Sequence, residues 1–113
     1  MKQLKKKNLT DINNEKKYLE LLNKLTNKVK RRSAEPIYIT QISGNGMNAN
    51  LFLISEVIMK HCRDENLYCI NMASELDLNY DDFYDELHLN PIGSKKVSEY
   101  LFKKLSTILY KKT

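Results

Sequence analysis

The residues best suited to chemistry in this sequence are an acid and a histidine three positions apart, Asp85 and His88. A carboxylate at this spacing can reach back to the imidazole within one turn of chain, accept the Nδ1 proton and fix the tautomer. The ring then keeps Nε2 free to act as a base, and the carboxylate stabilises the imidazolium that forms. The spacing therefore predicts a general base, His88, and an acid that orients it, Asp85.

A regular element follows this pair. Asn90 and Pro91 are typical of a helix start, because asparagine caps free backbone amides and proline suits the first helical position. Apolar residues then recur at helical spacing with lysines between them, which predicts an amphipathic helix over 91–110. We expect this helix to hold Asp85 and His88 in place better than a free loop would.

The preceding chain alternates between strands and helices. Short β-branched and aromatic runs predict strands near 37–42 and 67–70, and helical periodicity predicts helices near 11–32 and 48–63. Strands that alternate with helices indicate βαβ units and a parallel sheet, so the expected fold class is α/β. Two strands are few for such a sheet, whose strands normally have neighbours on both edges. We therefore expect the chain to be part of a larger fold.

The stretch that contains Asp85, His88, Asn90, Gly93 and the closing helix resembles the last conserved block of the SGNH, or GDSL-type, hydrolases. In that family the C-terminal Asp-x-x-His supplies two of the three members of a catalytic triad. The order of the preceding helices and strands is similar to the second half of the same domain. The resemblance implies a partial three-layer α/β/α fold of the flavodoxin-like, SGNH type. Residues 1–10 would be a basic lead-in, and residues 11–113 the C-terminal portion of the domain.

The resemblance also implies ester hydrolysis or acyl transfer, with no metal and no organic cofactor. However, the Gly-Asp-Ser block that carries the family's nucleophile is missing, as is its Gly-x-Asn-Asp block. The run Ser43-Gly44-Asn45-Gly46 follows the wrong strand and lacks the preceding Gly-Asp, so we interpret it as a turn. We therefore expect a truncated or split hydrolase that is inactive alone, because losing triad members costs many powers of ten in rate.

The charge distribution leaves other classes of function open. Residues 1–34 hold 11 basic and 3 acidic residues, 35–92 hold 2 and 10, and 93–113 hold 6 and 1. The lysines lie on the polar sides of predicted helices without interleaved aromatic residues, which favours solvated helix faces over a nucleic-acid surface. The alternative to a hydrolase is a non-enzymatic α/β interaction module that pairs through its open sheet edge or basic helices. The expected partner is a missing N-terminal half or a second copy of the chain, with an ester as substrate once the site is complete.

The cysteines and the N-terminus bear on the cellular compartment. No apolar run approaches the ~20 residues that span a bilayer, and the basic N-terminus lacks the apolar stretch of a secretory signal. We therefore expect a cytoplasmic protein with no membrane partner. Cys62 and Cys69 lack metal-ligand spacing. Buried free thiols in a reducing compartment are the favoured interpretation, although the spacing leaves a disulfide between them open.

Overall fold

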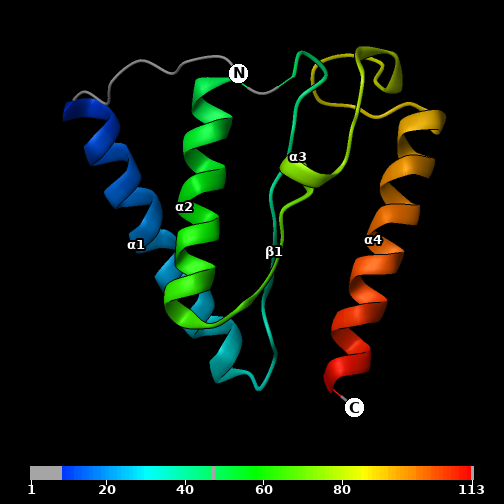
Figure 1. Ribbon diagram of the computed structural model, residues 1–113. Helices are drawn as coiled ribbons and strands as arrows, with labels where there is room; N and C mark the ends of the chain where they lie inside the picture. The colour runs from blue at the N-terminus through cyan, green and yellow to red at the C-terminus, as the bar shows by residue number, and fades with distance from the viewer. Residues whose placement is uncertain (1–8, 47, 113) are drawn as a thin grey trace. The chain divides into compact units, whose positions relative to one another are not determined.

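The computed structural model describes residues 9–46 and 48–112, which form four α-helices, a 3₁₀ turn and a small sheet (Figure 1). The elements in chain order are α1 (Leu9–Arg31), β1 (Ile37–Ile39), α2 (Ala49–Glu65), β2 (Tyr68–Ile70), α3 (Met72–Glu75), η1 (Tyr80–Asp82) and α4 (Pro91–Lys112). Most of the predicted lead-in, residues 1–10, lies outside the described residues, and Leu9 and Thr10 begin α1.

The α/β class is confirmed at a coarse level, because β1 and β2 form a two-stranded parallel sheet and α2 connects them. The expected three-layer, flavodoxin-like arrangement is not what the described residues form. Two strands of three residues each are too few for the central sheet of such a fold. The long helices lie within two residues of their predicted ends, whereas both strands are shorter than predicted.

The chain divides into two compact units. In the first unit α1 packs against α2, and the core contains Leu22, Ile58 and Cys62. Three polar side chains, those of Tyr38, Thr26 and His61, lie beside this core and are linked by hydrogen bonds. The hydroxyl of Thr26 lies 2.6 Å from the hydroxyl of Tyr38 and 2.9 Å from Nε2 of His61. These bonds satisfy the buried polar groups and tie α1, β1 and α2 together.

Cys62, near the end of α2, and Cys69, in β2, form a disulfide, with Cα atoms 6.1 Å apart. That separation lies within the usual range for disulfides. The favoured interpretation of two free thiols is therefore wrong. The turn between α2 and β2, with Asn66 in the left-handed region at φ 53°, returns the chain so that the two cysteines meet. The cysteines consequently give no argument for a reducing compartment.

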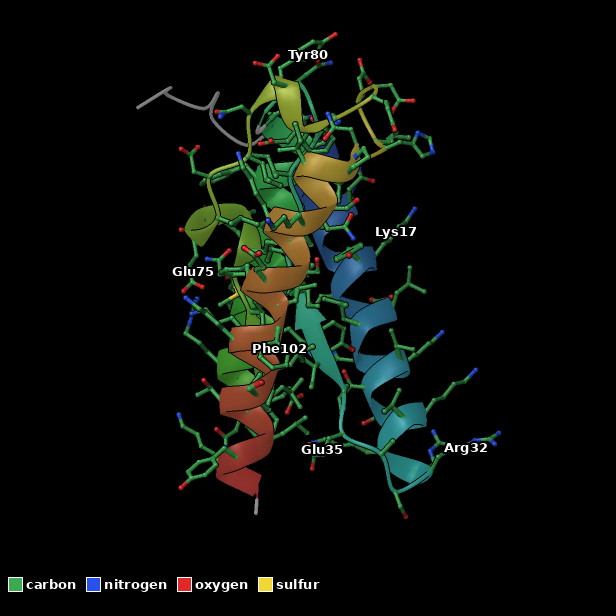
Figure 2. The ribbon with its side chains drawn as sticks, turned by 90° about the vertical axis from the view of Figure 1, so that its right-hand side faces the viewer. Lys17, Arg32, Glu35, Glu75, Tyr80 and Phe102 are labelled. Atoms are coloured by element: carbon green, nitrogen blue, oxygen red, sulfur yellow. A yellow bond between two sulfur atoms is a disulfide. The ribbon has the colours of Figure 1, made fainter. Side chains whose placement is uncertain are left out.

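The first helix carries its cations on the outside. Lys17, Lys24 and Lys28 are exposed, and Figure 2 shows Lys17 and Arg32 projecting away from the ribbon. The basic residues Lys28, Lys30 and Arg31 occupy the last turn of α1, where cations interact favourably with the helix dipole.

Among the described residues, we find no helix that combines the length and the apolar character needed to cross a bilayer.

The second unit holds the β1–α2 loop and the chain from Ile70 onward. The short helix α3 is tied to α4 by Glu75, which accepts a hydrogen bond from the hydroxyl of Tyr100 and lies 2.9 Å from Nζ of Lys104. Glu75 and Phe102 are labelled in Figure 2. The start of α3 is fixed by Thr40, whose hydroxyl donates to Asn71 and accepts the amide of Ala73. These contacts hold both ends of α3, the short helix that precedes η1 and the candidate site in the chain.

Candidate functional site

Asp85 and His88 lie on a short loop between η1 and α4. Phe83 and Leu89 face each other as an isolated antiparallel bridge, and the amide of Tyr84 donates to the carbonyl oxygen of His88 at 2.7 Å. These contacts close the loop at its base. The residues between Tyr84 and His88 therefore form a tight tip with little freedom to separate.

The structure brings the two predicted site residues together. His88 Nδ1 lies 2.8 Å from Asp85 Oδ2 and 2.9 Å from Asp85 Oδ1. Because an ionised carboxylate only accepts hydrogen bonds, Nδ1 is the donor in this pair and Nε2 is left with its lone pair. The side chains of His88 and Asp85 are 72% and 57% exposed, so the ring is open to solvent.

In addition to the His88 ring, two backbone amides hold the Asp85 carboxylate in place. Asp85 Oδ1 accepts the amide protons of Leu87 and His88, each at 2.8 Å. These two bonds form a local turn in which the side chain of Asp85 closes its own loop. The Leu87 amide, followed by the His88 ring and the His88 amide, lowers the pKa of Asp85 to about 2. The carboxylate is therefore ionised at every pH at which an imidazole can act as a base.

Asp82 supports the loop from its N-terminal side. Its buried carboxylate accepts the amide of Asn79 at 2.8 Å and lies 3.0 Å from Nζ of Lys96 on α4. The Asn79 amide and the Lys96 ammonium both lower the pKa of Asp82. An ionised buried carboxylate with these partners anchors η1 to α4, directly beside the loop. Neither Asp82 nor Lys96 was a predicted site residue.

Asn90 and Gly93 fix the start of α4. Oδ1 of Asn90 accepts the amide of Gly93 at 2.9 Å, as an N-cap does, and the Asn90 amide donates to the carbonyl of Asp82 at 2.9 Å. A Cβ atom on Gly93 would overlap the carbonyl oxygen of Asp82. The glycine of the Asp-x-x-His-x-Asn-x-x-Gly stretch is therefore required by close packing against η1, and the cap is formed as the sequence predicts.

The turn Ser43–Gly46 contacts the loop, which the sequence did not indicate. The amide of Gly44 donates to the carbonyl of Glu86 at 2.8 Å, and Nδ2 of Asn45 donates to Oε1 of Glu86 at 2.6 Å. The hydroxyl of Ser43 donates at 2.8 Å to the carbonyl of Gly46 within the same turn. The interpretation of this run as a turn is confirmed, and Ser43 has a role inside it.

Large apolar side chains near the pair are exposed. Tyr84 and Leu87 are on the loop, and Ile92 is in the first turn of α4; they are 72%, 80% and 63% exposed. Isolated exposed apolar residues are ordinary; these three lie within the nine residues 84–92, which also contain Asp85 and His88.

The remaining features of the described residues do not add to this site. No three histidine, cysteine, aspartate or glutamate side chains in the described part of the chain are grouped as metal ligands. An open pocket of about 360 Å³ in the first unit holds neither predicted site residue. It is lined by Asn14, Glu15, Tyr18, Asn50, Leu53, Ile54 and Val57.

A scan against models of protein families, a search of curated proteins and a search of solved structures each found no match to this chain. Function is therefore inferred from the geometry of Asp85 and His88 and of the residues that hold them.

Proposed function

We propose that this chain supplies the general base and its orienting acid to a serine hydrolase of the SGNH type, with the nucleophile contributed by another polypeptide segment. The observation that carries the proposal is the 2.8 Å contact between His88 Nδ1 and the Asp85 carboxylate, with the ring exposed to solvent. In this proposal the other segment also adds the strands that a three-layer α/β/α fold requires.

The proposed chemistry begins at Nε2 of His88. Nε2 takes the proton of a serine hydroxyl as the serine oxygen attacks the carbonyl carbon of an ester, and the tetrahedral intermediate forms. The imidazolium then gives that proton to the leaving alcohol as the carbon–oxygen bond breaks. Water repeats the sequence on the acyl-enzyme and releases the acid. Asp85 stays ionised throughout, because its pKa is about 2, and stabilises the imidazolium.

Two features of the surface support a partner segment. Among the described residues, each strand of the two-stranded sheet is paired with one other strand, whereas the strands of a three-layer fold normally have neighbours on both edges. The exposed side chains of Tyr84, Leu87 and Ile92 lie close to Asp85 and His88 in the chain. A segment that delivered a serine to His88 would cover these apolar groups, which favours association.

The test compares the chain alone with the chain completed by a partner. The purified chain should not hydrolyse p-nitrophenyl acetate faster than its Asp85→Ala/His88→Ala variant. Co-expression with a neighbouring coding segment that carries a Gly-Asp-Ser block should give turnover, and His88→Ala should lower it by at least ~10³-fold. Ser43→Ala is the matched control and should leave turnover unchanged.

Two results would contradict the proposal. Turnover by the chain alone, above that of the double variant, would show that the chain needs no outside nucleophile. Turnover by the completed protein that survives His88→Ala would remove the histidine from the reaction.

A second candidate function, a non-enzymatic interaction module, is favoured by the exposed face of α4. Phe102 and Leu109 are seven residues apart, lie on the same face of the helix, and are 73% and 59% exposed. A module that pairs through this face should lose self-association in a Phe102→Ser/Leu109→Ser variant, measured by sedimentation velocity, and should keep it in His88→Ala. A monomeric wild-type chain would exclude pairing of the chain with itself.

A further inference from the structure

We propose that Gly44 and Asn45 are positioning residues for the Asp85–His88 pair and that they act through Glu86. The inference rests on the proposed function, because it concerns the same histidine. The turn Ser43–Gly46 then does more than connect β1 to α2.

The first step is the position of Glu86 in the loop. Glu86 follows Asp85 directly and precedes Leu87, whose amide donates to Asp85 Oδ1 at 2.8 Å. The peptide groups on both sides of Glu86 thus belong to the turn that holds the carboxylate against His88 Nδ1. A displacement of Glu86 must change the direction of the Leu87 amide, and with it the orientation of the carboxylate.

The turn Ser43–Gly46 donates two hydrogen bonds to Glu86. Gly44 is buried, and its amide donates to the carbonyl oxygen of Glu86 at 2.8 Å. Asn45 is exposed, and its Nδ2 donates to the carboxylate of Glu86 at 2.6 Å. One contact fixes the backbone of Glu86 and the other fixes its side chain, so the residue cannot rotate without breaking a bond.

The backbone of Asp85 and the ring of Phe83 lie very close to Gly44. A Cβ atom there would lie 2.5 Å from the carbonyl oxygen of Asp85 and 3.1 Å from the ring of Phe83. Backbone atoms cannot move aside as a flexible side chain can. Any side chain larger than hydrogen at this position would push the peptide of Asp85 away from the turn.

The residues of the turn divide into two roles, which makes the inference testable. Ser43 and Gly46 shape the turn itself, through the hydroxyl-to-carbonyl bond between them and the left-handed conformation of Gly46 at φ 88°. Gly44 and Asn45 reach outward to Glu86. A merely structural role of the turn would make Ser43 matter to the pair as much as Asn45 does.

The main experiment is a donor–acceptor exchange read out on the ring of His88. Asn45→Asp places a second carboxylate against Glu86, and at pH 8 and low ionic strength the two charges repel. Long-range ¹H–¹⁵N correlation spectra should show wild-type His88 as the Nδ1–H tautomer and the variant as a mixture of both tautomers. Adding Glu86→Gln to Asn45→Asp exchanges donor and acceptor and should restore the wild-type tautomer. Ser43→Ala should leave the tautomer unchanged, because the Gly46 amide still donates to the Ser43 carbonyl oxygen at 2.9 Å and keeps the turn closed.

A second variant probes the close approach directly. Gly44→Ala should raise the pKa of Asp85 from about 2 toward its usual value near 3.8, followed by ¹³C chemical shifts of the carboxyl carbon. If this variant does not fold, the exchange experiment with Asn45 and Glu86 decides the question.

The proposal is overturned if folded Asn45→Asp keeps the Nδ1–H tautomer, or if Ser43→Ala disturbs the ring to the same extent. Neither readout needs a serine or an ester. Failure of the positioning role is therefore distinguishable from failure of the hydrolase proposal, which is judged on turnover.

Discussion

At the scale of single residues, the carboxylate of Asp85 both closes a turn of the backbone and contacts the ring of His88. Its Oδ1 closes a turn on the amides two and three residues ahead, and the same carboxylate meets the ring of the third residue. All of these contacts lie within four consecutive residues. The sequence could therefore predict this pair, because local spacing alone determines which groups can meet.

The pKa of Asp85 should respond only partly to loss of the ring. His88→Gln removes one of the groups that lower it, but the Leu87 amide, which contributes most, remains. We expect a pKa between about 2 and the usual value near 3.8, measured by ¹³C shifts of the carboxyl carbon. A rise all the way to the usual value would show that the ring, and not the amide, dominates.

The loop should also have a defined response to acid. Because the pKa of Asp85 is lower in the folded loop than its usual value, the ionised carboxylate stabilises the loop fully above pH 3.8, and this contribution is lost as the pH falls toward about 2. The amide shifts of Leu87 and His88 should follow this loss. In Asp85→Asn the same amides should be insensitive to pH over that range, and a wild-type-like titration in this variant would contradict the assignment.

At the scale of elements, close packing at the start of α4 requires a glycine at position 93. Gly93 is in the first turn of α4, and alanine has the higher intrinsic helix propensity. Its Cβ position is occupied by the carbonyl oxygen of Asp82, however, so the tertiary contact overrides the propensity. Just beyond β1, the amide of Thr40 donates to the carbonyl oxygen of Ile70 at 3.0 Å, and the hydroxyl of Thr40 donates to Asn71 at 2.8 Å.

Gly93→Ala should therefore destabilise the protein despite its higher helix propensity. We expect a loss of about 1–3 kcal/mol in the free energy of unfolding, as for other overpacked sites, measured by urea denaturation. Ser94→Ala, at the next and exposed position of the helix, should change the free energy by no more than about 0.5 kcal/mol. A Gly93→Ala variant as stable as wild type would show that η1 and α4 are not packed this closely.

The link between α2 and β2 gives a redox prediction. The disulfide between Cys62 and Cys69 closes a short loop, and such a link stabilises by about 2–3 kcal/mol. Addition of dithiothreitol should lower the urea midpoint by a corresponding amount and should leave a Cys62→Ala/Cys69→Ala variant unaffected. Thiol reagents that react with two cysteines of the unreduced, denatured chain would show that the link is absent.

At the scale of the whole molecule, the sequence predicts what is local and misses what is distant. The helix positions and the α/β class follow from periodicity, which repeats within each element. The contact between Asn45 and Glu86 joins residues forty-one positions apart, and no periodic pattern signals it. The disulfide joins cysteines only seven positions apart, and the sequence left that pairing open. The left-handed backbone at Asn66, in the turn between the two cysteines, has no periodic signal in the sequence.

The most direct test of the central claim is the protonation state of the His88 ring in the wild-type chain. Long-range ¹H–¹⁵N correlation on the neutral imidazole assigns the proton to one nitrogen. The Asp85 contact predicts that Nδ1 carries it and that Nε2 is a bare acceptor, and that Asp85→Asn abolishes the preference. A wild-type ring protonated on Nε2 would contradict the account, because the nitrogen that must receive a serine proton would already hold one.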